Sequence, residues 1–233
     1  MQHKSFKGSA PCKLISSDTK KFKPSGTSIS PDWTSNNWSG YARNKSKKNA
    51  FHSISGYWVV PKVAPAKKNT YSSAWIGIDG FHNKSLIQIG TEQDHENGSC
   101  VYYAWWEILP AAEKRIPYPV SSGDRMYAKI NKLSGNKWSM LLRNLTKKWR
   151  FRIVRTYNGP AASAEWIMEA AAFDGRTGPL ANYGKMTFYN LRVNNRNPLL
   201  KRSERGIMIQ NDKTVSTPSL PNKARNAFTV AYG

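Results

Sequence analysis

Two short stretches decide the fold: Leu86-Ile87-Gln88-Ile89-Gly90 and Ala164-Glu165-Trp166-Ile167-Met168-Glu169. Both combine large apolar residues with polar side chains, of which Gln88 and Glu169 are the most informative. Successive side chains of a β-strand point to opposite faces of the sheet, so Gln88 and Glu169 point away from their apolar neighbours. A polar side chain on such a strand faces water, a hydrogen-bond partner or a binding site.

Two neighbouring stretches, residues 74–80 and 102–108, show the same alternation. Gathered on one sheet surface, the alternate positions of all four stretches would form a cleft with aromatic walls. Its walls would include Trp75 and Trp105, and its floor would hold Asp79, Gln88, Glu107 and Glu169. Aromatic walls with a few convergent polar groups are typical of binding sites. An antiparallel sheet with one solvated face also alternates in this way, so the pattern leaves that alternative open.

Short strand-like segments alternate with turn signals such as Asn97-Gly98 from residue 36 onward. This spacing predicts an all-β fold, an antiparallel β-sandwich of the jelly-roll or concanavalin-like kind. Residues 33–233 would form this domain. Residues 1–32 are rich in Lys, Ser, Thr and Pro and would form an extended basic arm or the remnant of a prosegment. We expect strands near residues 37–43, 52–60, 71–79, 85–91, 101–109, 125–132, 137–144, 150–156, 164–170, 185–193 and 227–232.

Composition limits the class of protein. At 233 residues, the chain can bury the core of one large all-β domain or two small ones. No apolar run approaches the ~20 residues of a membrane span, and the polar, basic first residues contain no secretory signal. The net charge of +22 would suit anionic surfaces or acidic polysaccharides. We favour the alternative that scattered Lys and Arg serve solubility, and no specific nucleic-acid-binding motif accompanies them.

Cys12 and Cys100 are the only cysteines, and neither they nor the four histidines have the spacing of a metal site. The two cysteines could form one disulfide that closes a long loop or remain as two buried free thiols. We therefore expect no metal and no cofactor. Serine and cysteine hydrolases are disfavoured, because the chain lacks a Gly-x-Ser-x-Gly elbow and neither cysteine lies in a nucleophile motif.

Seven motifs, in their order and spacing, resemble the glutamic peptidase family, the eqolisins, between about residue 36 and residue 190. They are Asn37-Trp38-Ser39-Gly40-Tyr41, Gly56-Tyr57-Trp58-Val59-Val60-Pro61, Ser73-Ala74-Trp75-Ile76-Gly77-Ile78-Asp79-Gly80, Leu86-Ile87-Gln88-Ile89-Gly90, Tyr103-Ala104-Trp105-Trp106-Glu107, Gly123-Asp124 and Ala164-Glu165-Trp166-Ile167-Met168-Glu169. The resemblance implies a sandwich of two antiparallel sheets with an active site on its concave face. It also implies an acid endopeptidase that resists classical aspartic-protease inhibitors.

The resemblance also assigns residues to roles. The catalytic glutamine of the family falls on Gln88, and its catalytic glutamate falls on Glu169. Positions that line the cleft or support this dyad fall on Trp38, Trp75, Asp79 and Glu107, and alternation places Trp105 beside them.

Three features depart from the family pattern. Ala170, Ala171 and Ala172 follow the catalytic glutamate where an acidic residue is common, and Tyr103 stands where a small acid is expected. The chain is also basic, whereas characterised fungal members are acidic. These departures bear on pH range and substrate preference.

As a mechanistic hypothesis, Glu169 is the general base that takes a proton from water and returns it to the leaving amine. The amide of Gln88 orients the water or stabilises the developing oxyanion. We expect a polypeptide substrate, a monomer and export from the cell. Two alternatives stay open. One is a jelly-roll glycoside hydrolase using two carboxylates such as Glu107 and Glu169; the other is a non-catalytic lectin-like or polyanion-binding module.

Overall fold

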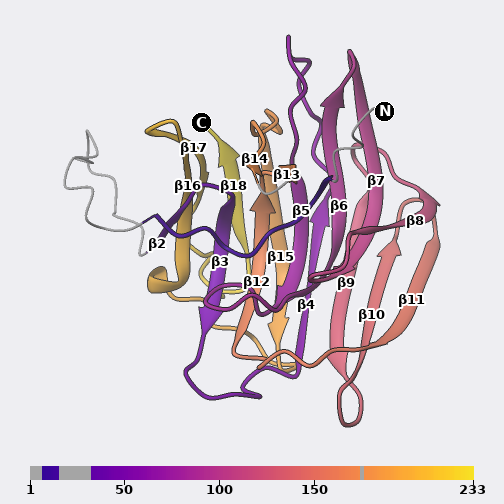
Figure 1. Ribbon diagram of the computed structural model, residues 1–233, viewed down its shortest axis with the longest axis vertical. Helices are drawn as coiled ribbons and strands as arrows, with labels where there is room; N and C mark the ends of the chain where they lie inside the picture. Colours follow the sequence, from indigo (N-terminus) through magenta and orange to yellow (C-terminus); the bar gives the residue numbers. More distant parts are fainter. Residues whose placement is uncertain (1–6, 16–32, 174–175) are drawn as a thin grey trace.

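The computed structural model describes residues 7–15, 33–173 and 176–233, and these form an antiparallel β-sandwich, as the sequence predicts (Figure 1). The only helical element among them is the short 3-10 turn η1 (Arg202–Glu204). The strands are β1 (Lys7–Gly8), β2 (Trp33–Ser35), β3 (Trp38–Asn44), β4 (Ser53–Val59), β5 (Ser73–Ile78), β6 (Ile87–Glu96), β7 (Ser99–Ile108), β8 (Lys114–Pro119), β9 (Arg125–Lys132), β10 (Lys137–Asn144), β11 (Trp149–Thr156), β12 (Ser163–Glu169), β13 (Ala172–Phe173), β14 (Arg176–Thr177), β15 (Lys185–Val193), β16 (Arg205–Gln210), β17 (Lys213–Pro218) and β18 (Phe228–Tyr232).

One layer, which we call the cleft sheet, runs in the order β15-β18-β17-β16-β3-β12-β5-β6-β7-β8. The other, which we call the basic sheet, runs in the order β11-β10-β9-β4-β15. Strand β15 belongs to both: Lys185–Phe188 pairs with β18, and the residues from Tyr189 onward pair with β4. Just after this change of partner the pairing with β4 has a β-bulge between Tyr189 and Arg192, and Asn190 within it has φ 49°. A bulge bends a strand and increases its twist, which lets one strand pass from one layer to the other.

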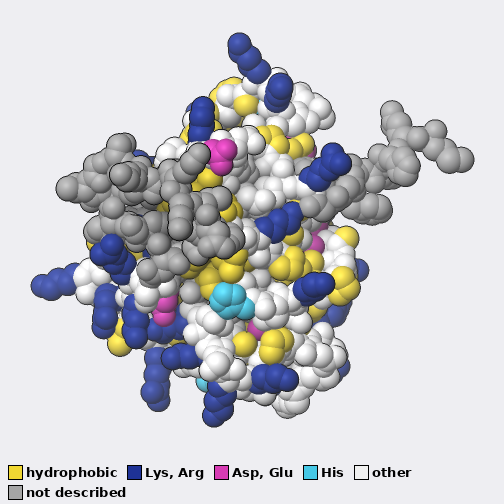
Figure 2. Space-filling view, turned by 60° about the vertical axis from the view of Figure 1, so that its left-hand side comes forward, with side chains coloured by type: hydrophobic (Ala, Val, Ile, Leu, Met, Phe, Trp, Pro, Cys, Tyr) yellow, Lys and Arg dark blue, Asp and Glu magenta, His cyan; other side chains and the backbone are white. Residues whose placement is uncertain are grey.

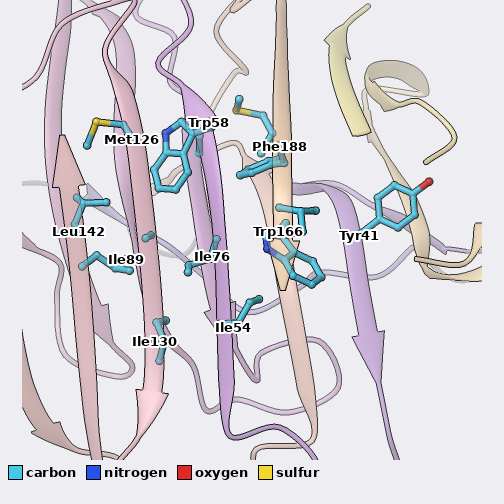
Figure 3. Close-up of a cluster of buried hydrophobic side chains, with 14 of the residues drawn as sticks. Tyr41, Ile54, Trp58, Ile76, Ile89, Met126, Ile130, Leu142, Trp166 and Phe188 are labelled. Carbon is cyan, nitrogen blue, oxygen red and sulfur yellow. The ribbon is translucent and has the colours of Figure 1, made fainter. Parts of the chain in front are cut away.

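The core lies between the two sheets and is built from one face of each (Figure 3). Alternation decides which residues face it. In β12, Ala164, Trp166 and Met168 point into the core. The basic sheet contributes matching positions from β4, β9 and β10, among them Trp58 and Met126. The core leaves Glu165 and Glu169 of β12 on the opposite face of the cleft sheet.

Each of the eleven expected strands overlaps an observed one, but the sequence analysis missed three substantial strands. Strand β8 contains Pro117 and Pro119, which argue against a strand interior; it lies at the edge of its sheet, where proline is tolerated. Strands β16 and β17 form a hairpin around Asn211 and Asp212, both with positive φ. Asn and Asp accept this conformation in two-residue hairpin turns.

Both cysteines are free thiols, Cys12 half-buried and Cys100 exposed, so the expectation that two free thiols would both be buried is wrong for Cys100. Cys100 lies near the start of β7, where the strand leaves the core. Within the described ranges, no helix is long and apolar enough to cross a membrane.

Candidate active site

The outer face of the cleft sheet carries the predicted site residues on four adjacent strands. Strand β12 pairs with β5, β5 with β6, and β6 with β7, all antiparallel. The register places Trp75 opposite Ile167, and Gln88 opposite both Gly77 and Glu107. Every one of the side chains Gln88, Glu107 and Glu169 is at most 2% exposed.

Gln88 is held by Glu107 from the neighbouring strand. The side-chain Nε2 of Gln88 donates to Oε2 of Glu107 over 2.6 Å. The side-chain Oε1 of Gln88 is buried and has no hydrogen-bond partner within the described part of the chain. A buried acceptor without a partner costs free energy, so this oxygen is positioned to accept a hydrogen bond from a ligand or a water molecule.

Glu169 is held by Trp75. The indole Nε1 of Trp75 donates to Oε2 of Glu169 over 2.8 Å, and the Trp75 ring packs edge-to-face against Trp38 at 4.8 Å. The ring lies over Gly77, where an added Cβ would come within 2.7 Å of it. Only glycine at residue 77 therefore lets the tryptophan reach across the strands to the carboxylate.

The chain's own N-terminal segment, residues 7–15, occupies the cleft. The backbone N–H of Ala10 donates to Oε1 of Glu169 over 3.0 Å. The carbonyl of Ala10 accepts from Trp38 Nε1 at 3.0 Å, and the carbonyl of Pro11 accepts from Asn37 Nδ2 at 3.2 Å. On the other side, strand β1 pairs with β13. The segment thus lies extended against the site, as a bound peptide would.

Lys7 anchors the segment in an acidic pocket. Its Nζ lies 2.8 Å from Oε2 of Glu92 and also bonds Asp94. The rings of Tyr71 and Tyr103 lie 4.9 and 5.3 Å from the same Nζ, within the range of cation–π attraction. Burial lowers the pKa of Lys7, but the nearby carboxylates more than offset this and raise it.

Sequence reasoning missed this pocket, although the signal was present. Glu92 and Asp94 continue the period-two alternation that begins at Gln88 and lie on the same strand, β6. The strand expected from the sequence ends at residue 91, so it does not include these two acids. Asn37, which fixes the segment's backbone, was quoted in a motif but not assigned a role.

The structure places two other predicted residues differently. Asp79 lies at the end of β5, where it accepts hydrogen bonds from the Tyr157 hydroxyl at 2.6 Å and from the N–H groups of Ala161 and Ala162 at 2.7 and 2.8 Å. It therefore fixes the loop that leads into β12. Trp105 is fully buried in the apolar cluster on the cleft side, and its Nε1 has no hydrogen-bond partner among the described residues.

Burial raises the pKa of three carboxyl groups on the cleft side of the sheet, those of Glu107, Glu165 and Glu169. The pKa of Glu169 rises to about 8, although the N–H groups of Ala10 and Trp75 oppose the rise. Burial, with the charge of Glu169 added, raises the pKa of Glu107 to about 9. Glu107 therefore keeps its proton to higher pH, and Glu169 is the first of the two to ionise. Burial also raises the pKa of Glu165 well above its ordinary value.

These raised pKa values predict that the full chain is more stable in mild acid than in alkali. A carboxyl whose folded pKa exceeds its unfolded value stabilises the fold below the unfolded pKa, near 4.5, and this contribution is lost as pH rises through the folded pKa. The pH range over which this stability is lost ends at about pH 8 to 9, near the pKa values of Glu169 and Glu107. We expect the Tm at pH 9 to be lower than at pH 5 by about 5–10 °C.

Thermal unfolding followed by circular dichroism across this range checks the prediction. Glu165→Gln should flatten the dependence, because it removes one buried group that titrates. A Tm that rises steadily from pH 5 to pH 9 would contradict it.

Comparison with known proteins decides the family. The sequence profile described as the Peptidase A4 family matches residues 36–232. The chain belongs to the Peptidase A4 family. This is the family of glutamic peptidases, or eqolisins, that the sequence motifs resemble. Among curated protein sequences, none matches the chain.

Solved structures of peptidase A4 proteins share the fold. Scytalido-glutamic peptidase with a transition-state analogue inhibitor is similar, with a TM-score of 0.71, 21% identity, and coverage of 85% of this chain and 98% of that one. SCP-B, an eqolisin in complex with the tripeptide Ala-Ile-His, has a TM-score of 0.65 and 20% identity, over 85% of this chain and 98% of that one. Aspergilloglutamic peptidase from Aspergillus niger has a TM-score of 0.57 and 23% identity, over 70% and 99%.

The match to the Peptidase A4 family begins at residue 36, so it does not include the segment in the cleft. Within the described ranges, no group of three His, Cys, Asp or Glu side chains is arranged to hold a metal ion.

Proposed function

We propose that this peptidase A4 protein is an endopeptidase in which Glu169 is the general base and Gln88 positions the reacting groups. The observation that carries the proposal is the seating of the chain's own backbone against Glu169, with the N–H of Ala10 at 3.0 Å from its Oε1. A carboxylate that meets a backbone nitrogen of an extended peptide is placed to return a proton to that nitrogen when it becomes a leaving amine.

These contacts also indicate which bond of a substrate would lie at the catalytic residues. If residues 7–15 mark the path of a substrate, the Ser9–Ala10 bond stands where the scissile bond would lie. Glu169 takes a proton from water while the water oxygen bonds to the scissile carbonyl carbon. The tetrahedral intermediate then breaks its C–N bond, and the proton from Glu169 completes the amine. Gln88 Oε1, buried without a partner within the described chain, can accept the second hydrogen of the water.

Glu107 has a supporting role in this scheme. It receives the hydrogen bond from Gln88 Nε2 and so fixes which way the amide faces. The second hydrogen of Nε2 is then available to the developing oxyanion. Losing one such donor costs about 10²–10³ in rate in other hydrolases.

Digestion of an unfolded protein substrate from pH 2 to pH 7 tests the function. We expect wild-type protein to release peptides and Gln88→Ala to lose activity by about 10²–10³ with an unchanged circular dichroism spectrum. Equal activity in both would remove Gln88 from the mechanism. No peptide release by a folded protein freed of residues 1–15, together with release of sugars from an oligosaccharide, would favour the glycoside hydrolase alternative.

The pH profile tests the assignment of the base. Glu169 must be ionised to act, so the rate should fall as pH drops through its pKa. Burial raises this pKa to about 8, and solvent that enters the cleft when the segment leaves would lower it toward its ordinary value near 4.5. The ascending limb should lie between these values. An acid optimum, expected from the family resemblance, stays a prediction, as do export and a monomeric state.

We expect a basic side chain to be selected three residues before the scissile bond, the position of Lys7 in the cleft. A peptide with lysine there should have a kcat/KM about 10–100 times that of the same peptide with norleucine, because Glu92 and Asp94 bond the ammonium in a buried pocket. Paired peptides assayed with the protein freed of residues 1–15 measure this ratio.

The double variant Glu92→Gln/Asp94→Asn should lower that ratio toward one while the norleucine peptide is still cleaved. A ratio that stays unchanged in the variant would show that the pocket does not select lysine over norleucine in the substrate. Cleavage of the norleucine peptide separates this failure from loss of the peptidase itself.

A further inference from the structure

The outer face of the basic sheet lies on the side of the sandwich opposite the cleft. Its five strands, β4, β9, β10, β11 and β15, contain no Asp or Glu. The basic residues that these strands place on the outer face are Arg125, Lys129, Lys137, Arg143, Arg150, Arg152 and Arg192. Within the described part of the chain, none of them forms an ion pair with a carboxylate; the ion pairs found there involve Lys7, Arg43 and Lys147.

The acids of the protein are gathered elsewhere. Half of its fourteen Asp and Glu residues lie in or beside the cleft: Asp79, Glu92, Asp94, Glu107, Glu113, Glu165 and Glu169. Figure 2 shows another part of the surface, on which Lys and Arg again far outnumber Asp and Glu.

Two rows of side chains cross the five strands. The first row runs Arg150, Arg143, Tyr127, Tyr57, Tyr189 through directly opposed positions of β11, β10, β9, β4 and β15. The second row, two residues along, runs Arg152, Leu141, Lys129, Ser55, Arg192. Arg143 and Arg150 face one another with no acid between them, and like charges directly opposite are destabilising. An anion bound across the rows would remove that repulsion.

The three tyrosines are packed against each other. Tyr57 lies 4.6 Å from Tyr127 and 5.5 Å from Tyr189 between ring centroids, the latter pair stacked with an interplanar angle of 26°. All three side chains are half-buried. Because Tyr57 stacks on Tyr189 and lies tilted against Tyr127, this row offers mainly ring edges and hydroxyl groups to a ligand at its centre.

A pocket of about 380 Å³ opens where the two rows meet β15. Its lining is polar apart from Leu191: Ser55, Tyr57, Tyr127, Asn190, Arg192, Asn197 and Asn226. Hydroxyl and amide groups beside an arginine suit a ligand that carries both hydroxyl groups and a negative charge. Arg192, which follows the bulge at Asn190, lines this pocket.

We infer that the outer face of the basic sheet binds a linear acidic polysaccharide, with its carboxylate or sulfate groups on Arg143, Arg150 and Arg192 and its hydroxyl groups on the tyrosine row and the pocket.

Three observations select this occupant. Arginines without an acidic partner attract an anion. A single-stranded nucleic acid would need exposed aromatic faces for stacking, which Tyr57 does not offer. A membrane surface would need an apolar side to insert, and the face offers little beyond Val59 and Val154.

Bound in this way, the polysaccharide would leave the cleft on the opposite side open. The protein would then be held on an acidic matrix while its cleft meets polypeptides. This inference is independent of the proposed function, since binding can be measured without any cleavage.

Binding to the full chain by isothermal titration calorimetry tests it. The probes are an oligogalacturonate, a sulfated dextran oligosaccharide, the uncharged dextran oligosaccharide and oligodeoxythymidylate, all of matched length. We expect binding of at least one charged oligosaccharide, weakening as salt increases, and none of the uncharged one. The two charged sugars distinguish carboxylate from sulfate as the preferred group.

Two variants locate the site. Arg143→Ser/Arg192→Ser should raise the Kd of the charged oligosaccharide at least about ten-fold. The control Lys67→Ser/Lys68→Ser removes the same charge from an exposed loop and should change the Kd less than about two-fold. Tyr57→Phe removes one hydroxyl group from the row and should weaken binding a few-fold without changing the charge.

Three outcomes would overturn the inference. Equal losses in the arginine and lysine variants would mean that only net charge matters. Tighter binding of oligodeoxythymidylate than of either charged sugar would assign the face to nucleic acid. Absence of binding to both charged sugars at low salt, by a protein with an unchanged circular dichroism spectrum, would leave the face without this function.

Discussion

Glu169→Gln should abolish peptide hydrolysis, with a loss of about 10³-fold or more in kcat/KM, and leave the sandwich folded. General base catalysis of this kind contributes about 10²–10⁴. Glutamine has nearly the shape of glutamate and can still accept the hydrogen bond from Trp75 Nε1, which Glu169 Oε2 accepts at 2.8 Å. Its amide cannot take a proton from water. The variant therefore removes the general base and keeps the packing of the side chain.

The chain offers a matched control in Glu165→Gln. Glu165 lies four residues earlier on the same face of β12, is fully buried, and has no hydrogen-bond partner for either oxygen among the described residues. Burial raises its pKa well above the ordinary value, and glutamine there has nearly the shape of the glutamate that it replaces. We expect activity within a few-fold of wild type. Equal loss in both variants would mean that the strand is disturbed, and full activity in Glu169→Gln would exclude it as the base.

Removing residues 1–15 should activate the enzyme strongly. Residues 7–15 place Ala10 against Glu169 and Lys7 in the acidic pocket, so a substrate must displace them. If the cleft is open in about 1% of molecules, an enzyme without the segment would show a kcat/KM about 100-fold higher. Cleavage of a quenched fluorescent peptide by a chain that begins at residue 16 measures the change.

A second variant tests the same point without shortening the chain. It is needed because the shortened chain loses the packing of Cys12 against the cleft-side apolar cluster and could misfold. Lys7→Glu in the full chain places a third negative charge beside Glu92 and Asp94 and should also raise activity. Lys13→Glu makes the same charge change outside the acidic pocket and should raise it much less. Unchanged activity in both the shortened chain and Lys7→Glu would mean that the segment does not compete with substrate.

The sequence predicted most of the sandwich because its strands alternate cleanly. In β12, Ala164, Trp166 and Met168 face the core and Glu165, Ile167 and Glu169 face the cleft, as period two requires. The strands it missed carry weaker local signals. The prolines of β8 are acceptable only because neighbouring elements make it an edge strand, and β16 takes its place through pairing with distant β3 and β2.

Local alternation also placed Gln88, Glu107 and Glu169 on one face, because that depends only on each strand's own backbone. It could not show that Asp79 turns away to hold Ala161 and Ala162, since this depends on a loop more than eighty residues later in the chain. Nor could it show what fills the cleft. The contact between Ala10 and Glu169 joins residues 159 positions apart.

The sequence by itself thus determined which side chains share a face, because side-chain direction along a strand is a local property of the backbone. Tertiary structure alone decided which faces meet. It brought the N-terminal segment onto Glu169, Lys7 between two acids, and five acid-free strands side by side as one basic surface. Those juxtapositions depend on strand order and register across the sheets, and these are settled by packing between segments far apart in the chain.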